Sequence, residues 1–453
     1  MKRFGPFEVE VESLGRGGVG QCRDDADKLW SVRAAPPGAR LRVIPMGRGN
    51  ARRVQLLRAP PEAALPPCPA FGSCGGCALQ ELPLEVQAAH RVALHVPAVG
   101  ASPDVVIHPV RGAGIAYGYR NRVEWSFGAK RWLTDDEVVS GTAGHGRWVG
   151  FHAPGRFDRV VDVDDCPVAH PDLVIVLRAV RRVLAESQLP AWDARDHVGF
   201  WRHLGARRSW ATGEVLVSVH TATHPEGEAE IERLFAGLPP VAGLTWHVFD
   251  GVADAALGPV VRVFGKDHID EVLGGIRFQL GPRTFFQNTT PGAEVLLSVV
   301  REALGPARGR LVDLYCGAGA LGLPLMAGHA SLLGVDEVAG SIDDARRTAE
   351  SAGLVGARFV AGKVEDVVAA GDLDGAAVVV DPPRVGLHPR AAASIATCQA
   401  SVIVYVACHA ASLGRDRAVF EGAGWRLTDL WPVDLFPQTT HLEVVGRFVR
   451  GVA

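Results

Sequence analysis

The sequence predicts an α/β protein in which a small antiparallel barrel and a central α+β domain precede an open, largely parallel Rossmann-like sheet. From about residue 285, apolar β-like runs alternate strictly with helical stretches, which is typical of such a sheet. Within it, residues 311–337 read as a buried strand, a glycine-rich turn, a helix and a second strand. Residues 1–58 instead alternate apolar and polar positions in short runs broken by Gly-Gly and Pro-Pro-Gly, which favours a small barrel.

Length and composition indicate a soluble globular protein of two or three domains. The chain has 453 residues, of which 47% are hydrophobic and 21% charged. No stretch reaches the ~18 uninterrupted apolar residues of a membrane span. The start, MKRFGPFEVEVESLG, has acidic residues where a signal peptide would be apolar, so we expect a cytoplasmic protein without membrane partners. A monomer is the default expectation.

Charge is distributed unevenly between the predicted barrel and the rest of the chain. Residues 1–58 carry a net charge of +6, whereas the other residues carry −9. A basic module of this kind suggests a polyanionic partner contacted through phosphates, although a solvated basic surface is an equal alternative. We therefore expect RNA binding by the barrel only if other features agree.

Residues 59–104 form a predicted linker with a proline-rich start, three clustered cysteines and a helix over 82–98. Cys68, Cys74 and Cys77 lie within ten residues, and Cys166 precedes a proline in the next domain. Three clustered thiolates and one distant thiolate suit an iron–sulfur cluster, while a Cys₄ zinc site has the same ligands. The C-x5-C spacing lies outside the usual x2–x4 of zinc knuckles and favours iron–sulfur.

The central α+β domain, residues 105–284, combines several β-like runs with one clear helix, DLVIVLRAVRRVLAES. Its segment YGYRNRVEWSFG, residues 117–128, interleaves arginines with aromatic side chains. Such interleaving is used to bind single-stranded RNA, but half of these aromatic residues fit a strand core equally well.

The sheet domain, residues 285–453, begins with a glycine turn that suits a nucleoside cofactor. Gly317, Gly319 and Gly322 follow an apolar strand, and glycine lets backbone amides approach a ligand at such a turn. Asp336 lies one βαβ unit further on, where a carboxylate can accept hydrogen bonds from ribose hydroxyls. The letters GAGALG fit NAD equally well, and a turn that only packs helix to strand is the simpler alternative.

Three further side chains fall at predicted strand ends of the same sheet. Asp381 precedes two prolines after an apolar strand, Cys408 ends SVIVYVAC, and Glu443 lies in the predicted final strand, HLEVVGRF. A thiolate can add to C6 of uracil, which makes C5 nucleophilic toward a methyl group, and a carboxylate can then remove the C5 proton. A buried structural thiol and an unrelated exposed acid are the alternatives.

A set of motifs in a fixed order resembles the S-adenosylmethionine-dependent RNA uracil-5-methyltransferases over nearly the whole chain. These motifs are C-x5-C-x2-C with a distant Cys-Pro, FFQNT, DLYCGAG, VVVDPPR, YVAC and DLFPQTTHLE. The barrel resembles the TRAM domain of that family. A TRAM domain together with the cysteines is similar to the branch that modifies 23S rRNA, so rRNA is the expected partner and tRNA the alternative.

The resemblance implies a class I methyltransferase fold and a role for each matching residue. Cys408 would be the nucleophile and Glu443 the base. The base-contacting residues would be Phe285, Gln287 and Arg384, with Phe285 holding a flipped uracil. S-adenosylmethionine would contact Gln287, Tyr315, Gly317, Gly319, Ala320, Asp336 and Asp381. A [4Fe–4S] cluster would be held by Cys68, Cys74, Cys77 and Cys166.

Some positions depart from the family pattern. His409, Ala410 and Ser412 replace the polar residue, proline and threonine that usually follow the nucleophile, and Ala320 replaces an Asn or Thr. Lys363 stands where a short polar residue would approach the adenine. These departures leave open an RNA-binding protein on a degenerate methyltransferase scaffold, and GAGALG leaves open an NAD-dependent oxidoreductase.

Overall fold

The computed structural model describes residues 5–306 and 309–450, which divide into two compact units that are not colinear with the sequence. The first unit contains residues 1–87, 116–269 and 437–440, and the second contains residues 88–115, 270–436 and 441–453. The expected linker is therefore shared between the units. The reason is that Val96 and Val99 of helix α1 (Leu84–Val99) pack into the core of the second unit.

The first unit begins with a closed five-stranded barrel of order β1-β2-β3-β5-β4, as the sequence predicts. Its interior is built from alternating buried residues such as Val9, Val11 and Leu41. A short 3₁₀ turn, η1 (Arg16–Gly18), joins the first two strands. The strands are β1 (Phe7–Leu14), β2 (Gly20–Arg23), β3 (Leu29–Val32), β4 (Arg40–Gly47) and β5 (Asn50–Arg58).

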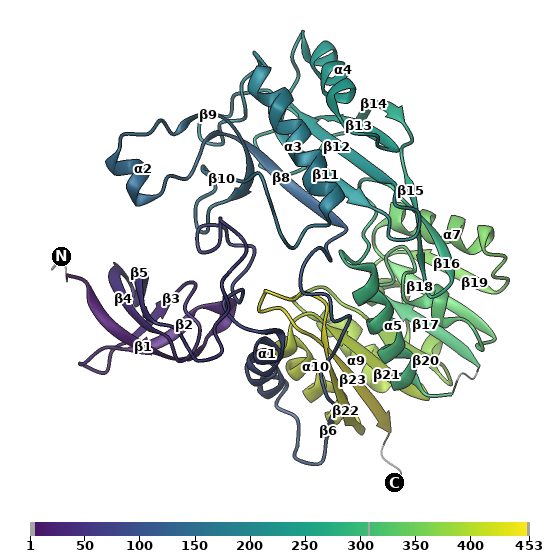
Figure 1. Cartoon of the computed structure of the whole chain (residues 1–453). Coiled ribbons are helices and arrows are strands. Elements are labelled where there is room, and N and C mark those ends of the chain that lie inside the picture. The colour runs from purple at the N-terminus through teal and green to yellow at the C-terminus, as the bar shows by residue number, and fades with distance from the viewer. Residues whose placement is uncertain (1–4, 307–308, 451–453) are drawn as a thin grey trace. The chain divides into compact units, whose positions relative to one another are not determined.

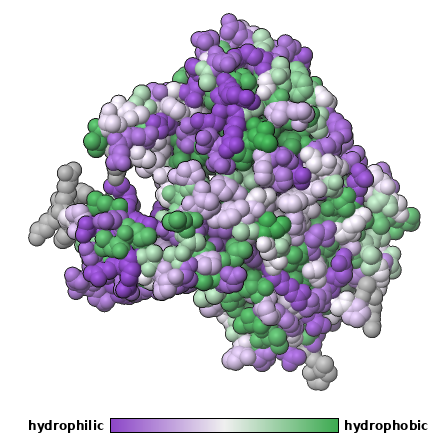
Figure 2. All heavy atoms as spheres, in the orientation of Figure 1, coloured by the Kyte–Doolittle hydropathy of each residue, from purple (hydrophilic) through white to green (hydrophobic). Residues whose placement is uncertain are grey.

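Part of the barrel's basic charge is neutralised within the barrel itself. The guanidinium groups of Arg40 and Arg42 each lie 3.0 Å from the Glu8 carboxylate, and that of Arg58 lies 3.1 Å from Glu10. Figure 2 shows hydrophobic as well as hydrophilic residues on the visible face of the barrel. The net charge of this segment therefore overstates the number of arginines available to a polyanion.

The central part of the first unit is a seven-stranded sheet of order β10-β9-β8-β11-β12-β13-β14. Helix α3 (Pro171–Glu186) buries its apolar face on this sheet, and α4 (Gly227–Gly237) packs beside α3 (Figure 1). A short helix, α2 (Asp135–Val139), lies between β8 and β9 in sequence. The strands are β8 (Arg122–Lys130), β9 (His145–His152), β10 (Val160–Asp162), β11 (Trp201–Arg208), β12 (Val215–Thr221), β13 (Gly243–Val248) and β14 (Val260–Gly265).

The second unit is built on a nine-stranded sheet of order β19-β18-β17-β20-β21-β23-β22-β6, with β7 also paired to β22. Neighbouring strands from β19 to β21 run parallel, and β23 runs antiparallel to both β21 and β22. The strands are β6 (Val106–Ile107), β7 (Arg111–Gly112), β17 (Arg310–Leu314), β18 (Ser331–Asp336), β19 (Ala357–Ala361), β20 (Ala377–Val380), β21 (Val402–Ala407), β22 (Trp425–Asp434) and β23 (Glu443–Arg450).

Helices and a small hairpin complete this unit. The hairpin pairs β15 (Ile269–Leu273) with β16 (Ile276–Leu280). Helix α5 begins after Thr289, whose side chain accepts a hydrogen bond from the Gly292 amide, and Pro291 fits the first turn. The helices are α5 (Thr290–Leu304), α6 (Gly322–Leu325), α7 (Ala339–Ser351), α8 (Val364–Val367), η2 (Ala370–Leu373), α9 (Pro389–Thr397) and α10 (Ala410–Gly422).

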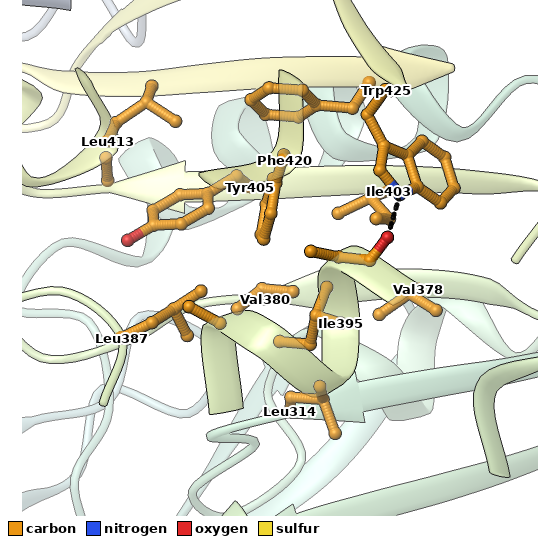
Figure 3. Close-up of a cluster of buried hydrophobic side chains, with 14 of the residues drawn as sticks. Leu314, Val378, Val380, Leu387, Ile395, Ile403, Tyr405, Leu413, Phe420 and Trp425 are labelled. Carbon is orange, nitrogen blue, oxygen red and sulfur yellow. Dashed lines mark hydrogen bonds between the residues drawn. The ribbon is translucent and has the colours of Figure 1, made fainter. Parts of the chain in front are cut away.

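The core of the second unit lies between the sheet and helices α9 and α10. Figure 3 shows Val380, Ile403 and Tyr405 from the strands packed with Ile395 and Phe420 from the helices. The Trp425 indole donates a hydrogen bond of 2.9 Å to the Ala396 carbonyl within this cluster. Such packing holds the strand ends in a fixed register. No helix in the described ranges is long and apolar enough to cross a membrane.

Candidate active site

Strand register brings the predicted catalytic residues to one edge of the sheet. Leu314, Val380 and Tyr405 lie side by side on β17, β20 and β21, so that Tyr315, Asp381 and Cys408 follow at the same edge. Because β23 is antiparallel and pairs Val444 with Ala407, its first residue, Glu443, starts at this edge as well. The structure therefore brings together Asp381, Cys408 and Glu443, as the sequence predicted.

A pocket of about 500 Å³, including space open to solvent, lies beside this edge. Its walls come from β15, the segment before α5, helix α5 itself, β17 with the glycine turn that follows it, and the residue after β20. The lining residues are Leu273, Phe285, Phe286, Gln287, Ala293, Leu296, Asp313, Tyr315, Cys316, Gly317, Ala318, Ala320, Leu321 and Asp381. The lining is mostly apolar and includes the two carboxyl groups of Asp313 and Asp381. Such a pocket suits a ligand that has an apolar part and a positive charge.

The glycine turn owes its shape to three alternate residues with positive φ. Tyr315, Gly317 and Gly319 have φ of 64°, 53° and 79°. The Asp336 carboxylate accepts a hydrogen bond of 3.0 Å from the Gly317 amide and one of 2.9 Å from the Val338 amide. Asp336 therefore holds the turn in place, in addition to the ribose contact that the sequence predicts for it. The left-handed conformation of Tyr315 is strained for a non-glycine residue and was not predictable from the motif.

Two carboxyl groups with raised pKa values lie at the pocket wall. Asp313 is buried in β17, and one of its oxygens accepts a hydrogen bond of 2.8 Å from the Gly322 amide. Its other oxygen has no hydrogen-bond partner among the described residues. Burial and then the Asp381 carboxylate raise the pKa of Asp313 to about 8. Burial also raises the pKa of Asp381 to about 7. These two groups can balance a cationic ligand by losing protons.

The electrostatic surroundings of Cys408 and Glu443 couple their protonation. Burial, followed by the Glu443 and Asp381 carboxylates, raises the pKa of the Cys408 thiol to about 11. Burial and then Asp381 raise the pKa of Glu443 to about 8. Arg384 lowers the pKa of both groups. A thiol and a carboxyl group in this relation can each hold or release a proton as a ligand changes the local charge.

The segment after Cys408 differs from the predicted family pattern and leads directly into helix α10. His409 is the N-cap residue of α10, and Ala410 begins the helix. The Ser412 hydroxyl donates a hydrogen bond of 2.6 Å to the His409 carbonyl. Cys408 thus lies just before the N-terminus of a 13-residue helix, where the helix dipole favours a thiolate.

Of the three residues predicted to contact a uracil, Phe285 and Gln287 line the pocket and Arg384 does not. Phe285 is 63% exposed although it is a large apolar side chain, and it lines the pocket together with Gln287. Arg384 follows Pro382 and Pro383, and its guanidinium donates a hydrogen bond of 3.1 Å to the Nδ1 atom of His441. An exposed aromatic ring of this kind is available for stacking on a base.

Of the eleven residues predicted to be catalytic, to bind the cofactor or to contact the base, six line the pocket and five do not. Phe285, Gln287, Tyr315, Gly317, Ala320 and Asp381 line it, whereas Gly319, Asp336, Arg384, Cys408 and Glu443 do not. Asp313, Cys316 and His441 were not predicted as site residues. For Asp313 the available signal was a lone acidic residue inside an otherwise apolar strand.

The four predicted cluster cysteines interact with one another in the first unit. Burial is the largest cause that raises the pKa of Cys74, to about 11, and the thiolates of Cys166 and Cys68 act in the same direction. Burial likewise raises the pKa of Cys77 to about 12, with contributions from Cys166 and Cys74. Cys22 is separate, since its thiol bonds to the Trp30 carbonyl inside the barrel.

Backbone amides surround these thiols. The Gly76 amide donates a hydrogen bond of 3.4 Å to the sulfur of Cys74. Backbone groups of Ala70 and Phe71 lower the pKa of Cys68, and those of Ala169 and Val168 lower that of Cys166. Amide donors to sulfur suit a polynuclear cluster. Within residues 5–306 and 309–450, however, no group of three or more His, Cys, Asp or Glu side chains meets the geometry of a metal site.

Comparison with known proteins identifies the fold class first. The family model described as "Methyltransferase small domain" matches residues 285–401. The solved structure of a Pyrococcus abyssi tRNA (uracil-54, C5)-methyltransferase in complex with S-adenosyl-L-homocysteine superposes with a TM-score of 0.77 at 24% identity. That match covers 98% of this chain and 100% of that chain. The second unit therefore has the class I S-adenosylmethionine-dependent methyltransferase fold, in a chain that begins with a small barrel.

Curated relatives identify the family. A Chlorobaculum tepidum protein is 34% identical over 88% of this chain and 86% of its own length. A Gloeobacter violaceus protein is 33% identical over 98% of this chain and 96% of its own length. A Caldanaerobacter subterraneus protein is 31% identical over 95% of each. All three are named as uncharacterized RNA methyltransferases. The chain belongs to this family of RNA methyltransferases, and S-adenosylmethionine is the cofactor that the comparisons support.

Proposed function

We propose that this RNA methyltransferase transfers a methyl group to C5 of a uracil base. The observation that carries the proposal is the antiparallel pairing of β21 with β23, which brings Cys408 and Glu443 to the edge where the cofactor pocket opens. A nucleophile and a base are both needed because the C5–C6 bond of uracil is unreactive toward a methyl donor until C6 is attacked.

The reaction follows from the chemistry of these two side chains. The Cys408 thiolate adds to C6, and the displaced electron pair makes C5 nucleophilic. S-adenosylmethionine would supply an electrophilic methyl group when bound, and C5 bonds to that group as the bond from the methyl carbon to sulfur breaks, leaving its electron pair on sulfur. Glu443 then accepts the C5 proton, the C5–C6 double bond re-forms, and the thiolate leaves. The products are 5-methyluridine in RNA and S-adenosylhomocysteine, so atoms and charges balance.

Cofactor binding is assigned to the glycine turn and its neighbours. Gln287, Tyr315, Gly317, Ala320 and Asp381 would contact S-adenosylmethionine directly from the pocket wall. Gly319 and Asp336 would hold the turn, with Asp336 also accepting from the ribose hydroxyls. Family membership favours this cofactor over NAD, which the GAGALG letters alone did not exclude.

Base binding is assigned to Phe285, Gln287 and Arg384. An aromatic ring at the pocket mouth can stack on a uracil that has been extruded from its helix. Extrusion is required because C5 and C6 of a stacked base are not accessible to a thiol on one side and a methyl donor on the other. The basic barrel and the central domain would contact the surrounding RNA backbone.

For the RNA target, 23S rRNA remains our proposal and tRNA the alternative. The rRNA assignment rests on the combination of a TRAM-like barrel with four cysteines. The Pyrococcus abyssi enzyme, whose name specifies uracil 54 of tRNA, supplies a specific reason to test tRNA in parallel.

Cys68, Cys74, Cys77 and Cys166 are proposed as ligands of a [4Fe–4S] cluster, with a Cys₄ zinc site as the alternative. Their mutual electrostatic influence and amide donors support a shared ligand. Protein purified without oxygen should absorb near 400 nm and contain about four iron and four sulfide per chain. A colourless protein with one zinc per chain would exclude the iron–sulfur proposal.

The proposed reaction is tested by incubating the purified protein with isotope-labelled S-adenosylmethionine and either 23S rRNA or tRNA. Nucleoside mass spectrometry should detect labelled 5-methyluridine, and Cys408→Ala should produce none. RNA binding by the wild-type protein without methylation of either RNA would favour the alternative of an RNA-binding protein on a degenerate scaffold.

A further inference from the structure

Arg384 is the cation that acts on both proposed catalytic residues, yet it forms no close ion pair with either. It lowers the pKa of Cys408 and of Glu443. Within the described part of the chain its guanidinium forms no salt bridge to a carboxylate, and its side chain is held by the hydrogen bond of 3.1 Å to His441 Nδ1. An exposed arginine held by one bond has many rotamers, so its position depends on that bond.

His441 is well placed to fix this arginine. It precedes Glu443 by two residues, and the ring lies edge-on to Phe436 with a centroid separation of 6.3 Å. A ring nitrogen that accepts from an arginine carries no proton, so the imidazole is neutral in this arrangement. A neutral acceptor leaves the positive charge of Arg384 intact, whereas a carboxylate in the same place would neutralise it.

We propose that His441 is a positioning residue that holds the Arg384 guanidinium against the reaction centre by accepting a hydrogen bond at Nδ1. The inference rests on the proposed role of Cys408 as nucleophile. In this role His441 positions Arg384 and does not itself contact the reacting atoms. A guanidinium has five N–H donors in total. The N–H groups of Arg384 that do not bond to His441 therefore stay available to the uracil.

The test measures alkylation of Cys408 by iodoacetamide between pH 6 and pH 10, with full-length protein and no RNA. Only the thiolate reacts, so the pH profile reports how strongly the surroundings favour it. Mass spectrometry of peptides separates Cys408 from the other cysteines. Buried Cys22 and Cys398 serve as an internal check, because they are alkylated only if a variant unfolds.

Three variants and a control define the expected result. Arg384→Met should slow Cys408 alkylation at pH 8 by about tenfold, since an adjacent opposite charge shifts a pKa by about 1–3 units. His441→Leu should reproduce most of that loss. His441→Asn, which keeps an acceptor near the Nδ1 position, should recover most of the wild-type rate. His145→Leu, on an exposed position of β9, should behave as wild type.

The outcomes separate this inference from the proposed function. A wild-type alkylation profile for His441→Leu, or equal losses in His441→Leu and His441→Asn, would overturn the positioning role. The expected profile together with no methylation of any RNA would refute the proposed function and leave the role of His441 standing. With a methylated RNA substrate, His441→Leu should lower kcat and leave the KM for S-adenosylmethionine unchanged.

Discussion

At the scale of single residues, three carboxyl groups of the proposed site have pKa values well above the ordinary range, those of Asp313, Asp381 and Glu443. Burial raises the pKa of Asp313 and of Glu443 to about 8, and that of Asp381 to about 7. In the folded protein these acids bind protons more tightly than in the unfolded chain. Their contribution to stability is therefore fully present below about pH 4, and it is lost as the pH rises toward 8.

We predict that Asp313→Asn flattens this pH dependence. The amide oxygen of Asn can still accept from Gly322, but it carries no charge to bury. Urea unfolding of the cofactor-free protein at pH 5, 6.5 and 8 should show wild-type stability falling with pH by up to about 1.4 kcal/mol per unit for each group. Asp313→Asn should fall less steeply. Exposed Asp25→Asn is the control, and an equal slope in wild type and Asp313→Asn would contradict the assignment.

We predict that Glu443→Gln stops the reaction after methyl transfer. Glutamine cannot accept the C5 proton, so the covalent link between Cys408 and C6 should persist. Turnover should fall by about 10²–10⁴-fold, and a protein–RNA adduct should accumulate on a denaturing gel with ordinary uridine-containing RNA. A variant that loses turnover without accumulating any adduct would argue that Glu443 acts before methyl transfer.

At the level of elements, the proposed cofactor site depends on the backbone of the glycine turn between β17 and α6. A Cβ added to Gly317 would meet no atom within 4 Å, whereas one on Gly319 would lie 2.8 Å from Leu323 Cδ1. Both residues have positive φ. Substitution at Gly317 therefore costs backbone strain alone, and substitution at Gly319 also displaces the side chain behind the turn.

We predict that Gly319→Ala weakens S-adenosylhomocysteine binding more than Gly317→Ala does. The strain common to both is worth about 1–2 kcal/mol, and the contact with Leu323 adds to it only at Gly319. Isothermal calorimetry on both variants gives the comparison. Gly340→Ala in α7, where a Cβ meets nothing within 4 Å, should bind like wild type. Equal losses at both turn positions would exclude a role for Leu323.

The sequence predicted where the strands of this site end, but it did not predict which strands pair with one another. Asp381 and Cys408 were located because apolar strands end immediately before them, a local signal. The nearness of Glu443 to Cys408 depends on antiparallel pairing of β23 with β21, which no local pattern specifies. The burial of Asp313, the left-handed backbone of Tyr315 and the bond between Arg384 and His441 arise from tertiary contacts and were not predicted.

For the whole molecule, the chain forms two units whose sequences interleave. Residues 437–440 belong to the first unit, although residues 436 and 441 on either side belong to the second. Within the first unit the Gln438 carbonyl accepts hydrogen bonds of 2.8 and 3.0 Å from the amides of Ala78 and Leu79, directly after Cys77. The predicted domain order did not anticipate this interleaving, because it was drawn from local sequence patterns taken in order along the chain.

We predict that the barrel contributes a measurable share of the salt dependence of RNA binding. Arg33 and Arg48 are exposed arginines of the barrel segment. Replacing both with alanine should reduce the slope of log Kd against log salt by about 0.7 for each phosphate that these arginines neutralise. Filter binding from 50 to 300 mM KCl measures the slope. Arg426→Ala, an exposed arginine on β22, is the matched control, and an unchanged slope in the barrel variant would exclude such phosphate binding.

Covalent trapping tests the central claim most directly. Full-length protein is incubated with S-adenosylmethionine and RNA that contains 5-fluorouridine, whose C5 fluorine cannot be removed as a proton. We predict a stable protein–RNA adduct, with mass spectrometry locating the methylated 5-fluorouridine on Cys408 and with Cys408→Ala forming none. An active preparation that methylates ordinary RNA but forms no adduct, or forms it through another residue, would contradict the account.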